Sequence, residues 1–213
     1  MTSLAPKIIS QPRIDGAAQN VLRLAFLSFT VTILLFCTLA SAEEREATVE
    51  FAFSNDPADV VLTVSTYADQ TVSRRRLVLY GDGRTELSRS KWGRPTKTYV
   101  IQLSRQERNH LLHTAAVHRL PEWNDASILA RMSRKLGDGV FGPPDAAVAT
   151  VELSVKRYQR GAIKRQNTTI SFEFKGVGSA AELFPEIQEI VGIKEIIGHM
   201  RILLRKAEEA QQP

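Results

Sequence analysis

The chain has 213 residues, with 28 Lys and Arg against 23 Asp and Glu, which gives a formal net charge of +5 at pH 7. Three of those basic residues and one acid lie in residues 1–42 (the leader), so residues 43–213 carry a net charge of only +3. This mild basicity excludes reading the overall charge as a signal for specific nucleic-acid binding. The only cysteine, Cys37, also lies in the leader, so residues 43–213 can form neither a disulfide nor a thiolate metal site.

The leader has the pattern of an export signal. Residues 24–42 contain no charged side chain, Arg23 directly precedes them, and the run closes on the small residues Ala40, Ser41 and Ala42. Small residues at the end of an apolar run that follows a basic flank predict cleavage by a signal peptidase after Ala42. The run is also close to the roughly 20 residues that a membrane-spanning helix needs. A retained anchor is therefore the alternative, in which residues 24–42 make the only membrane contact. In both cases residues 43–213 are expected outside the cytoplasm, in the periplasm or secreted.

Alternation of apolar and polar residues at a period of two predicts five strands in the first half of the exported part. They are expected at residues 49–53, 60–65, 77–80, 84–89 and 99–103. Asp82-Gly83 separates the third from the fourth and predicts a tight turn with positive φ angles. Residues 92–95 are expected to form a loop.

The period then changes to that of a helix. Ser104 and Glu107 form a capping box that predicts a helix start, and Pro121 is expected to end this central helix. A weaker helical stretch over residues 128–136 and a Gly/Pro loop over residues 137–145 follow.

Two more alternating runs predict strands at residues 149–155 and 170–174. A second capping box, Ser179 to Glu182, predicts the start of a C-terminal helical region that Pro185 kinks or restarts. Apolar residues recur there at helical spacing and form a narrow seam of Ile190, Ile193, Ile197, Met200 and Leu204. The pattern predicts a single α+β domain over residues 43–213, with an antiparallel sheet of about seven strands in two groups. A central helix and a long C-terminal helix should pack on that sheet.

No motif for catalysis or cofactor binding has the sequence context that it needs. Residues 137–142 match G-x-G-x-x-G, but two prolines follow and a helix is expected before them, so a loop is predicted. The sequence has no G-x-S-x-G, H-E-x-x-H, phosphate-binding lysine loop or EF-hand, and no cofactor is predicted. This weakens an enzymatic function, although catalytic carboxylates from distant positions keep a hydrolase as an alternative.

Histidines supply a weak candidate for a metal site. His110 and His113 lie on the central helix, with Glu107 one turn earlier as a carboxylate that could complete a site. Metal sites on one helix favour a spacing of four residues, and the spacing here is three. Solvent-facing histidines are therefore the simpler interpretation, and no metal site is predicted.

A basic cluster brackets the turn between the last two predicted strands. It consists of Lys156, Arg157, Arg160, Lys164 and Arg165. A positive hairpin end could contact an anionic surface, such as lipid headgroups or an acidic polymer. Solvated strand ends have the same composition, and this remains the alternative.

The segment from Leu77 to Arg84, with its Tyr80-Gly81-Asp82-Gly83 hairpin, is followed by a strand and by Leu103-Ser104 at a helix start. This arrangement resembles a type of exported bacterial α+β domain of unknown function that carries a YGDG hairpin. Residues 184–187 are similar to the terminal segment of those domains. The resemblance implies the exported compartment and the α+β fold, and it brings no catalytic residue.

The sequence thus favours an exported, non-catalytic domain that binds a partner, such as an envelope protein or an anionic surface, through its sheet or its basic hairpin. The alternatives are a hydrolase with a dispersed site and a membrane-anchored accessory subunit. In the accessory subunit, the seam of the C-terminal helix would pair with another helix.

Overall fold

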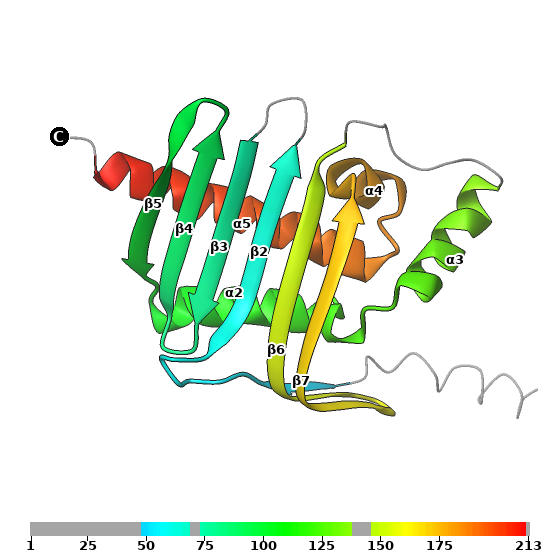
Figure 1. Cartoon of the computed structure of the whole chain (residues 1–213). Helices are drawn as coiled ribbons and strands as arrows, with labels where there is room; N and C mark the ends of the chain where they lie inside the picture. Colours follow the sequence, from blue (N-terminus) through cyan, green and yellow to red (C-terminus); the bar gives the residue numbers. More distant parts are fainter. Residues whose placement is uncertain (1–47, 69–72, 138–145, 212–213) are drawn as a thin grey trace, which may run out of the picture. The chain divides into compact units, whose positions relative to one another are not determined.

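The computed structural model describes residues 48–68, 73–137 and 146–211, which belong to one compact unit. The predicted leader, with Cys37 and the cleavage position after Ala42, lies outside the described residues, as does the Gly/Pro loop beyond Gly137. The fold is α+β, as predicted, with a seven-stranded antiparallel sheet and a long C-terminal helix (Figure 1). No helix in the described ranges is long and apolar enough to cross a bilayer.

The sheet joins the two predicted groups of strands. The strands are β1 (Val49–Ala52), β2 (Val60–Ala68), β3 (Ser73–Tyr80), β4 (Arg84–Lys91), β5 (Arg94–Gln102), β6 (Val148–Arg160) and β7 (Ile163–Lys175). The helices are α2 (Arg105–Val117), the 3-10 turn η1 (Leu120–Glu122), α3 (Asp125–Leu136), α4 (Val177–Leu183) and α5 (Gln188–Ala210). One path of neighbours runs β5-β4-β3-β2-β6, and β7 pairs along the whole of β6. β1 pairs with the far half of β6, beyond the half that pairs with β2.

One face of the sheet is apolar because alternate side chains of every strand point to it. Val64, Leu77, Leu87 and Tyr99 are opposite one another across four strands and are all buried. Helices α2 and α5 lie on this face (Figure 1). All five residues of the predicted seam of α5 are buried, so this seam packs within the monomer and is not free to pair with another subunit's helix. The helix-pairing form of the accessory-subunit alternative therefore fails.

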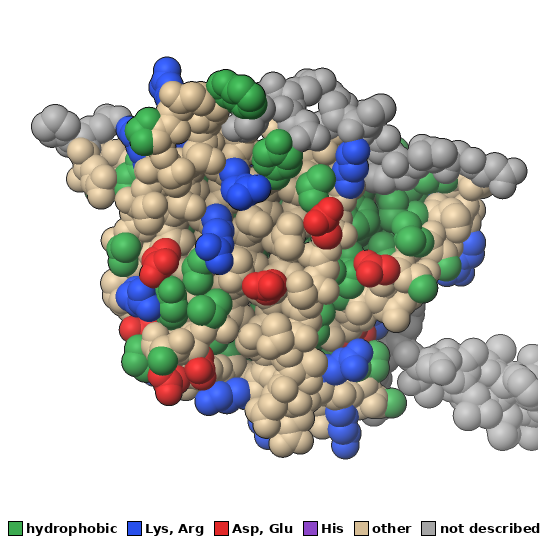
Figure 2. All heavy atoms as spheres, viewed as in Figure 1, with side chains coloured by type: hydrophobic (Ala, Val, Ile, Leu, Met, Phe, Trp, Pro, Cys, Tyr) green, Lys and Arg blue, Asp and Glu red, His purple; other side chains and the backbone are tan. Residues whose placement is uncertain are grey.

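The second face of the sheet is polar. Along β6, Thr150, Glu152 and Ser154 alternate with the buried Val151 and Leu153. Figure 2 shows acidic and basic side chains scattered over this face without a patch of one sign. This is the arrangement expected of an antiparallel sheet with one face open to water.

The turn between β3 and β4 forms as predicted but with a different geometry. Only Gly83 has a positive φ, of 94°, while Asp82 accepts a hydrogen bond from the backbone N–H of Arg84. Gly81 is needed for a different reason. A Cβ there would lie 2.4 Å from the backbone oxygen of Asp56, so the absence of a side chain lets the loop before β2 pack against the turn.

The helix boundaries match the sequence only in part. The capping box of α2 is confirmed, because Ser104 accepts a hydrogen bond from the N–H of Glu107 and the Glu107 carboxylate accepts one from the N–H of Ser104. Helix α2 ends before Pro121, because the chain turns at Arg119, which has a φ of 61°. The second predicted capping box is wrong. Gly176, with a φ of 74°, ends β7 and starts α4 at Val177, two residues before Ser179. Pro185 does separate α4 from α5.

Candidate functional site

Three cations of β3, β4 and β5 lie side by side on the helix-covered face of the sheet. Arg75 is opposite Arg89, and Arg89 is opposite Lys97, so the three cations form one row across β3, β4 and β5. Residues directly opposite in an antiparallel sheet share a face. On each strand the cation is two residues from a member of the buried row Leu77, Leu87 and Tyr99, so both rows lie on the same face. We call this row of Arg75, Arg89 and Lys97, which borders the apolar face, the basic margin.

The C-terminal half of α5 passes beside this row and contributes charges of both signs. The carboxylate of Glu208 forms an ion pair of 3.2 Å with the half-buried guanidinium of Arg89. Burial, followed by the charges of Arg89 and Arg201, lowers the pKa of Arg75, and Glu208 partly opposes this. Burial is the larger cause, and the repulsion from Arg89 and Arg201 shows that positive charges also lie close together here.

A cavity of about 600 Å³ opens between the end of the hairpin and the last turns of α5. We call it the cationic cleft. Its lining residues are Arg89, Lys91, Arg94, Pro95, Lys97, Thr98, Tyr99, Glu208 and Gln211. Four of these side chains are cationic and only Glu208 is acidic. Arginine and lysine side chains that converge on a concave surface concentrate anions there, and the arginine guanidinium binds phosphate or carboxylate through paired hydrogen bonds.

The hairpin end itself is short and well exposed. The turn consists of Trp92 and Gly93, and Gly93 has a φ of 66°. β5 starts at Arg94, so the loop predicted over residues 92–95 is shorter than expected. Pro95 is accommodated because β5 is an edge strand, where one side needs no N–H donor. Trp92 is 76% exposed, one residue after Lys91 and two before Arg94.

A second cavity, of about 450 Å³, continues the basic margin. Arg75, Lys194 and Arg201 are among its lining residues, together with backbone and small side chains from β2, β6 and α4. The basic surface therefore extends from the β4–β5 hairpin along α5.

The basic cluster predicted at the β6–β7 turn lies at the other end of the sheet (Figure 1). Lys156, Lys164 and Arg165 are exposed there. Arg157 is exposed too, and it lies 3.9 Å from the Glu50 carboxylate. Arg160 is directed toward the end of α2 and donates a hydrogen bond of 3.3 Å to the carbonyl oxygen of Val117. The five cations thus do not form one surface.

The histidines pair differently from the sequence hypothesis. The ring of His113 lies against Phe51, with 5.7 Å between centroids. His110 instead meets His199 of α5, with 3.1 Å between their Nε2 atoms. The Glu107 carboxylate is held by Ser104 in the capping box. Among the described residues, no group of three or more His, Cys, Asp or Glu side chains is placed to hold a metal ion.

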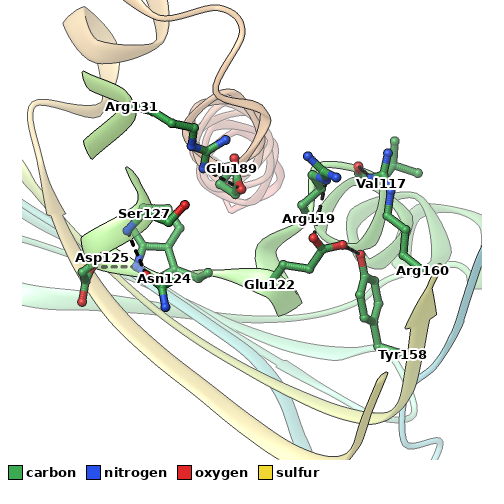
Figure 3. Close-up of polar contacts among 11 residues, drawn as sticks. Val117, Arg119, Glu122, Asn124, Asp125, Ser127, Arg131, Tyr158, Arg160 and Glu189 are labelled. Atoms are coloured by element: carbon green, nitrogen blue, oxygen red, sulfur yellow. Dashed lines mark hydrogen bonds and ion pairs between the residues drawn. The ribbon is translucent and has the colours of Figure 1, made fainter. Parts of the chain in front are cut away.

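Another group of ionisable side chains lies around η1 (Figure 3). The Tyr158 hydroxyl donates to Glu122, whose second oxygen lies 3.6 Å from Arg119. Nearby, Arg131 and Glu189 form an ion pair of 2.8 Å. The carboxyl side chains of Glu122 and Glu189 are only 9% and 7% exposed. Because both are paired and shielded from solvent, they favour a role in holding η1, α3 and α5 together over contact with a substrate.

The residues of the cationic cleft were not predicted as a site. The run from Arg74 to Arg76 is visible in the sequence, but Arg89 and Lys97 join Arg75 only through the register of three strands. Comparison with known proteins adds no homologue to this geometry, because no family model and no curated protein matches the chain.

Proposed function

We propose that residues 43–213 form an exported, non-catalytic domain that binds a phosphate-bearing ligand in the cationic cleft. The observation that carries the proposal is the charge of the cleft, which is lined by four cations and one carboxylate. Half-buried Arg89 is the central side chain, since its guanidinium is already oriented by Glu208. Phosphate is the preferred chemistry because its oxygens accept the paired hydrogen bonds of arginine and its charge attracts lysine.

The β6–β7 end is the competing location for such a ligand. It presents four exposed cations, Lys156, Arg157, Lys164 and Arg165, of which Arg157 is paired with Glu50 at 3.9 Å. A cleft binds anions better than an exposed end, because its low-dielectric walls focus the field of the charges.

Two double variants with equal loss of charge compare the two ends. One variant is Lys91→Gln with Lys97→Gln in the cleft, and the other is Lys156→Gln with Lys164→Gln at the β6–β7 end. All four lysines are exposed, so the fold should tolerate each change. Binding of polyphosphate at low salt is measured by calorimetry. Because each removed charge near the ligand is worth about 1 kcal/mol in water, the cleft variant should lose roughly tenfold or more in affinity. The other variant should stay within about twofold. The reverse ranking would refute the cleft.

The source of the phosphate is distinguished by a second probe. The same two variants are tested for sedimentation with vesicles of phosphatidylglycerol and phosphatidylcholine. If the ligand is a free phosphate polymer, the chain should bind polyphosphate but not the vesicles. If the ligand is a lipid headgroup, the chain should bind both. Failure of the chain to bind either probe would refute the proposed function.

The exported location rests on the leader. The chain is expressed in a host that exports it, and the N-terminus and the cell fraction of the product are determined. A mature N-terminus at Glu43 in the soluble fraction supports cleavage after Ala42. An intact leader in the membrane fraction would support the anchored alternative, and a full-length cytoplasmic product would refute export.

A further inference from the structure

His110 of α2 and His199 of α5 face each other where the two helices pack. Their Nε2 atoms are 3.1 Å apart and their rings are nearly perpendicular, at 80°, with centroids 4.7 Å apart. A hydrogen bond between two imidazole nitrogens requires a proton on one and a lone pair on the other, so at least one ring is neutral. The same arrangement places two imidazole nitrogens of different helices at the spacing of a chelate.

We propose that His110 and His199 bind a divalent transition-metal ion of the kind that prefers imidazole, such as Zn²⁺, Ni²⁺ or Cu²⁺. With metal–nitrogen distances of about 2.0–2.1 Å, two nitrogens 3.1 Å apart make an angle of about 100° at the metal. This value lies between the angles of about 90° and about 109° found in square-planar and tetrahedral sites. At this angle the metal lies to one side of the line between the two nitrogens, so it displaces the shared proton and the two rings turn to direct both lone pairs toward it.

The surroundings leave room for the remaining ligands. A cavity of about 290 Å³ adjoins the pair, and its lining includes Gln106 and Glu107 of α2 and Leu203 and Lys206 of α5. The Glu107 carboxylate stays in the capping box, 4.0 Å from the Lys206 amine. The described part of the chain therefore supplies two ligands, and water or an external donor fills the other positions. Catalytic zinc centres use three protein ligands and one open position, so this two-histidine site leaves more positions to water or an external donor than they do.

The state of His199 suits a metal ligand. This half-buried ring has a pKa lowered by burial and by the neighbouring His110, and Glu195 partly opposes the shift. Metals bind the neutral imidazole, so a ring that resists protonation competes better for them. The other histidine at this helix contact, His118, is already bonded to Gln188 and Glu195 at 3.1 and 3.3 Å.

The test uses the full chain with Cys37→Ser as background, because a leader thiolate would bind the same metals, and with any affinity tag removed. Zn²⁺ is titrated by calorimetry, and thermal unfolding is followed with and without the ion. We expect one ion per chain and a higher Tm with Zn²⁺, since an ion bound to both helices stabilises only the folded state. Mg²⁺, which prefers oxygen ligands, should give no shift.

Three variants locate the site. His110→Gln and His199→Gln should each lose at least tenfold in Zn²⁺ affinity and most of the Tm shift. His113→Gln is the matched control, because His113 is an exposed histidine of the same helix α2 whose ring lies against Phe51, and this variant should bind as the parent does. The Tm without metal confirms that each variant is folded. Unchanged affinity in His110→Gln, or an equal loss in His113→Gln, would overturn the proposal.

Discussion

The hydroxyl of Tyr158 on β6 donates a hydrogen bond to the buried carboxylate of Glu122 in η1 (Figure 3). This bond joins the β6–β7 hairpin to the turn that follows α2. Burial, the hydrogen bond and the charge of Glu122 all raise the pKa of Tyr158, so the hydroxyl remains a donor well above neutral pH. Tyr158 itself is fully buried, and the bond therefore has no competition from bulk water.

Tyr158→Phe should destabilise the domain by about 1–3 kcal/mol, because the buried Glu122 carboxylate loses a donor that water cannot replace. Tyr80→Phe is the control. Its hydroxyl lies 3.1 Å from the carboxylate of Glu86, which is 36% exposed, and water can take its place. The control should change the free energy of unfolding by less than about 0.5 kcal/mol. Urea unfolding measures the free energy of unfolding of both variants. Equal losses in the two variants would show that the buried bond to Glu122 contributes no more to stability than the exposed bond to Glu86.

Gly192 marks the point of closest approach between α5 and the end of α2. A Cβ at this position would lie 2.4 Å from the Cβ of His118 and 2.8 Å from Cδ1 of Leu120. Gly192→Ala should therefore cost about 1–3 kcal/mol through overpacking. On the same helix, a Cβ at Gly198 meets no atom within 4 Å. Gly198→Ala should instead stabilise by up to about 1 kcal/mol, since alanine favours a helix. Thermal unfolding should show a lower Tm for Gly192→Ala and a higher Tm for Gly198→Ala. An unchanged Tm in Gly192→Ala would contradict the close packing.

Most of the fold could be predicted because it depends on local periodicity. The alternation in β6 and the seam of α5 each reflect which side chains face the core, and burial confirms both. The start of α4 could not be predicted from Ser179 and Glu182. The chain already turns at Gly176, whose N–H donates to the carbonyl oxygen of Ala147, a contact between segments far apart in sequence.

The candidate site was much less predictable, because its parts meet only in three dimensions. Arg75, Arg89 and Lys97 form a row through strand register, and Glu208 reaches Arg89 across 119 residues of sequence. His110 and His199 are likewise 89 residues apart. The sequence hypothesis looked for partners on the same helix and chose His113. Clustering in sequence also did not show that Arg160 of the predicted basic cluster bonds to Val117 while the other four cations are exposed.

The capping box of α2 should make stability depend on pH in acid. Hydrogen bonds from the Ser104 side chain and backbone lower the pKa of Glu107 below its usual 4.5. A carboxylate with a lowered pKa in the folded state contributes stability above the unfolded value, and this contribution is lost as the pH falls through the folded value. The stability difference between the parent and Glu107→Gln, measured by urea unfolding from pH 6 to 3, should therefore shrink below pH 4.5. In a Ser104→Ala background this dependence should weaken, because the side-chain donor is lost while the backbone N–H still donates to Glu107. An unchanged dependence would contradict the side-chain hydrogen bond as the main cause.

Glu208 is the only acid lining the cationic cleft, so its removal should strengthen anion binding. In Glu208→Gln the guanidinium of Arg89 loses its partner at 3.2 Å, and the cleft gains one unit of net positive charge. Since one exposed charge pair is worth about 1 kcal/mol in water, polyphosphate affinity should rise about two- to tenfold at low salt. The gain should shrink at high salt, because exposed charges are screened there. Glu209→Gln changes the overall charge equally, but its carboxylate is near Arg205, at 3.9 Å, outside the cleft lining. If both variants gain equally, overall charge and not the cleft determines binding. If Glu208→Gln binds more weakly, the Glu208 carboxylate acts by orienting Arg89, and its charge does not compete with the ligand.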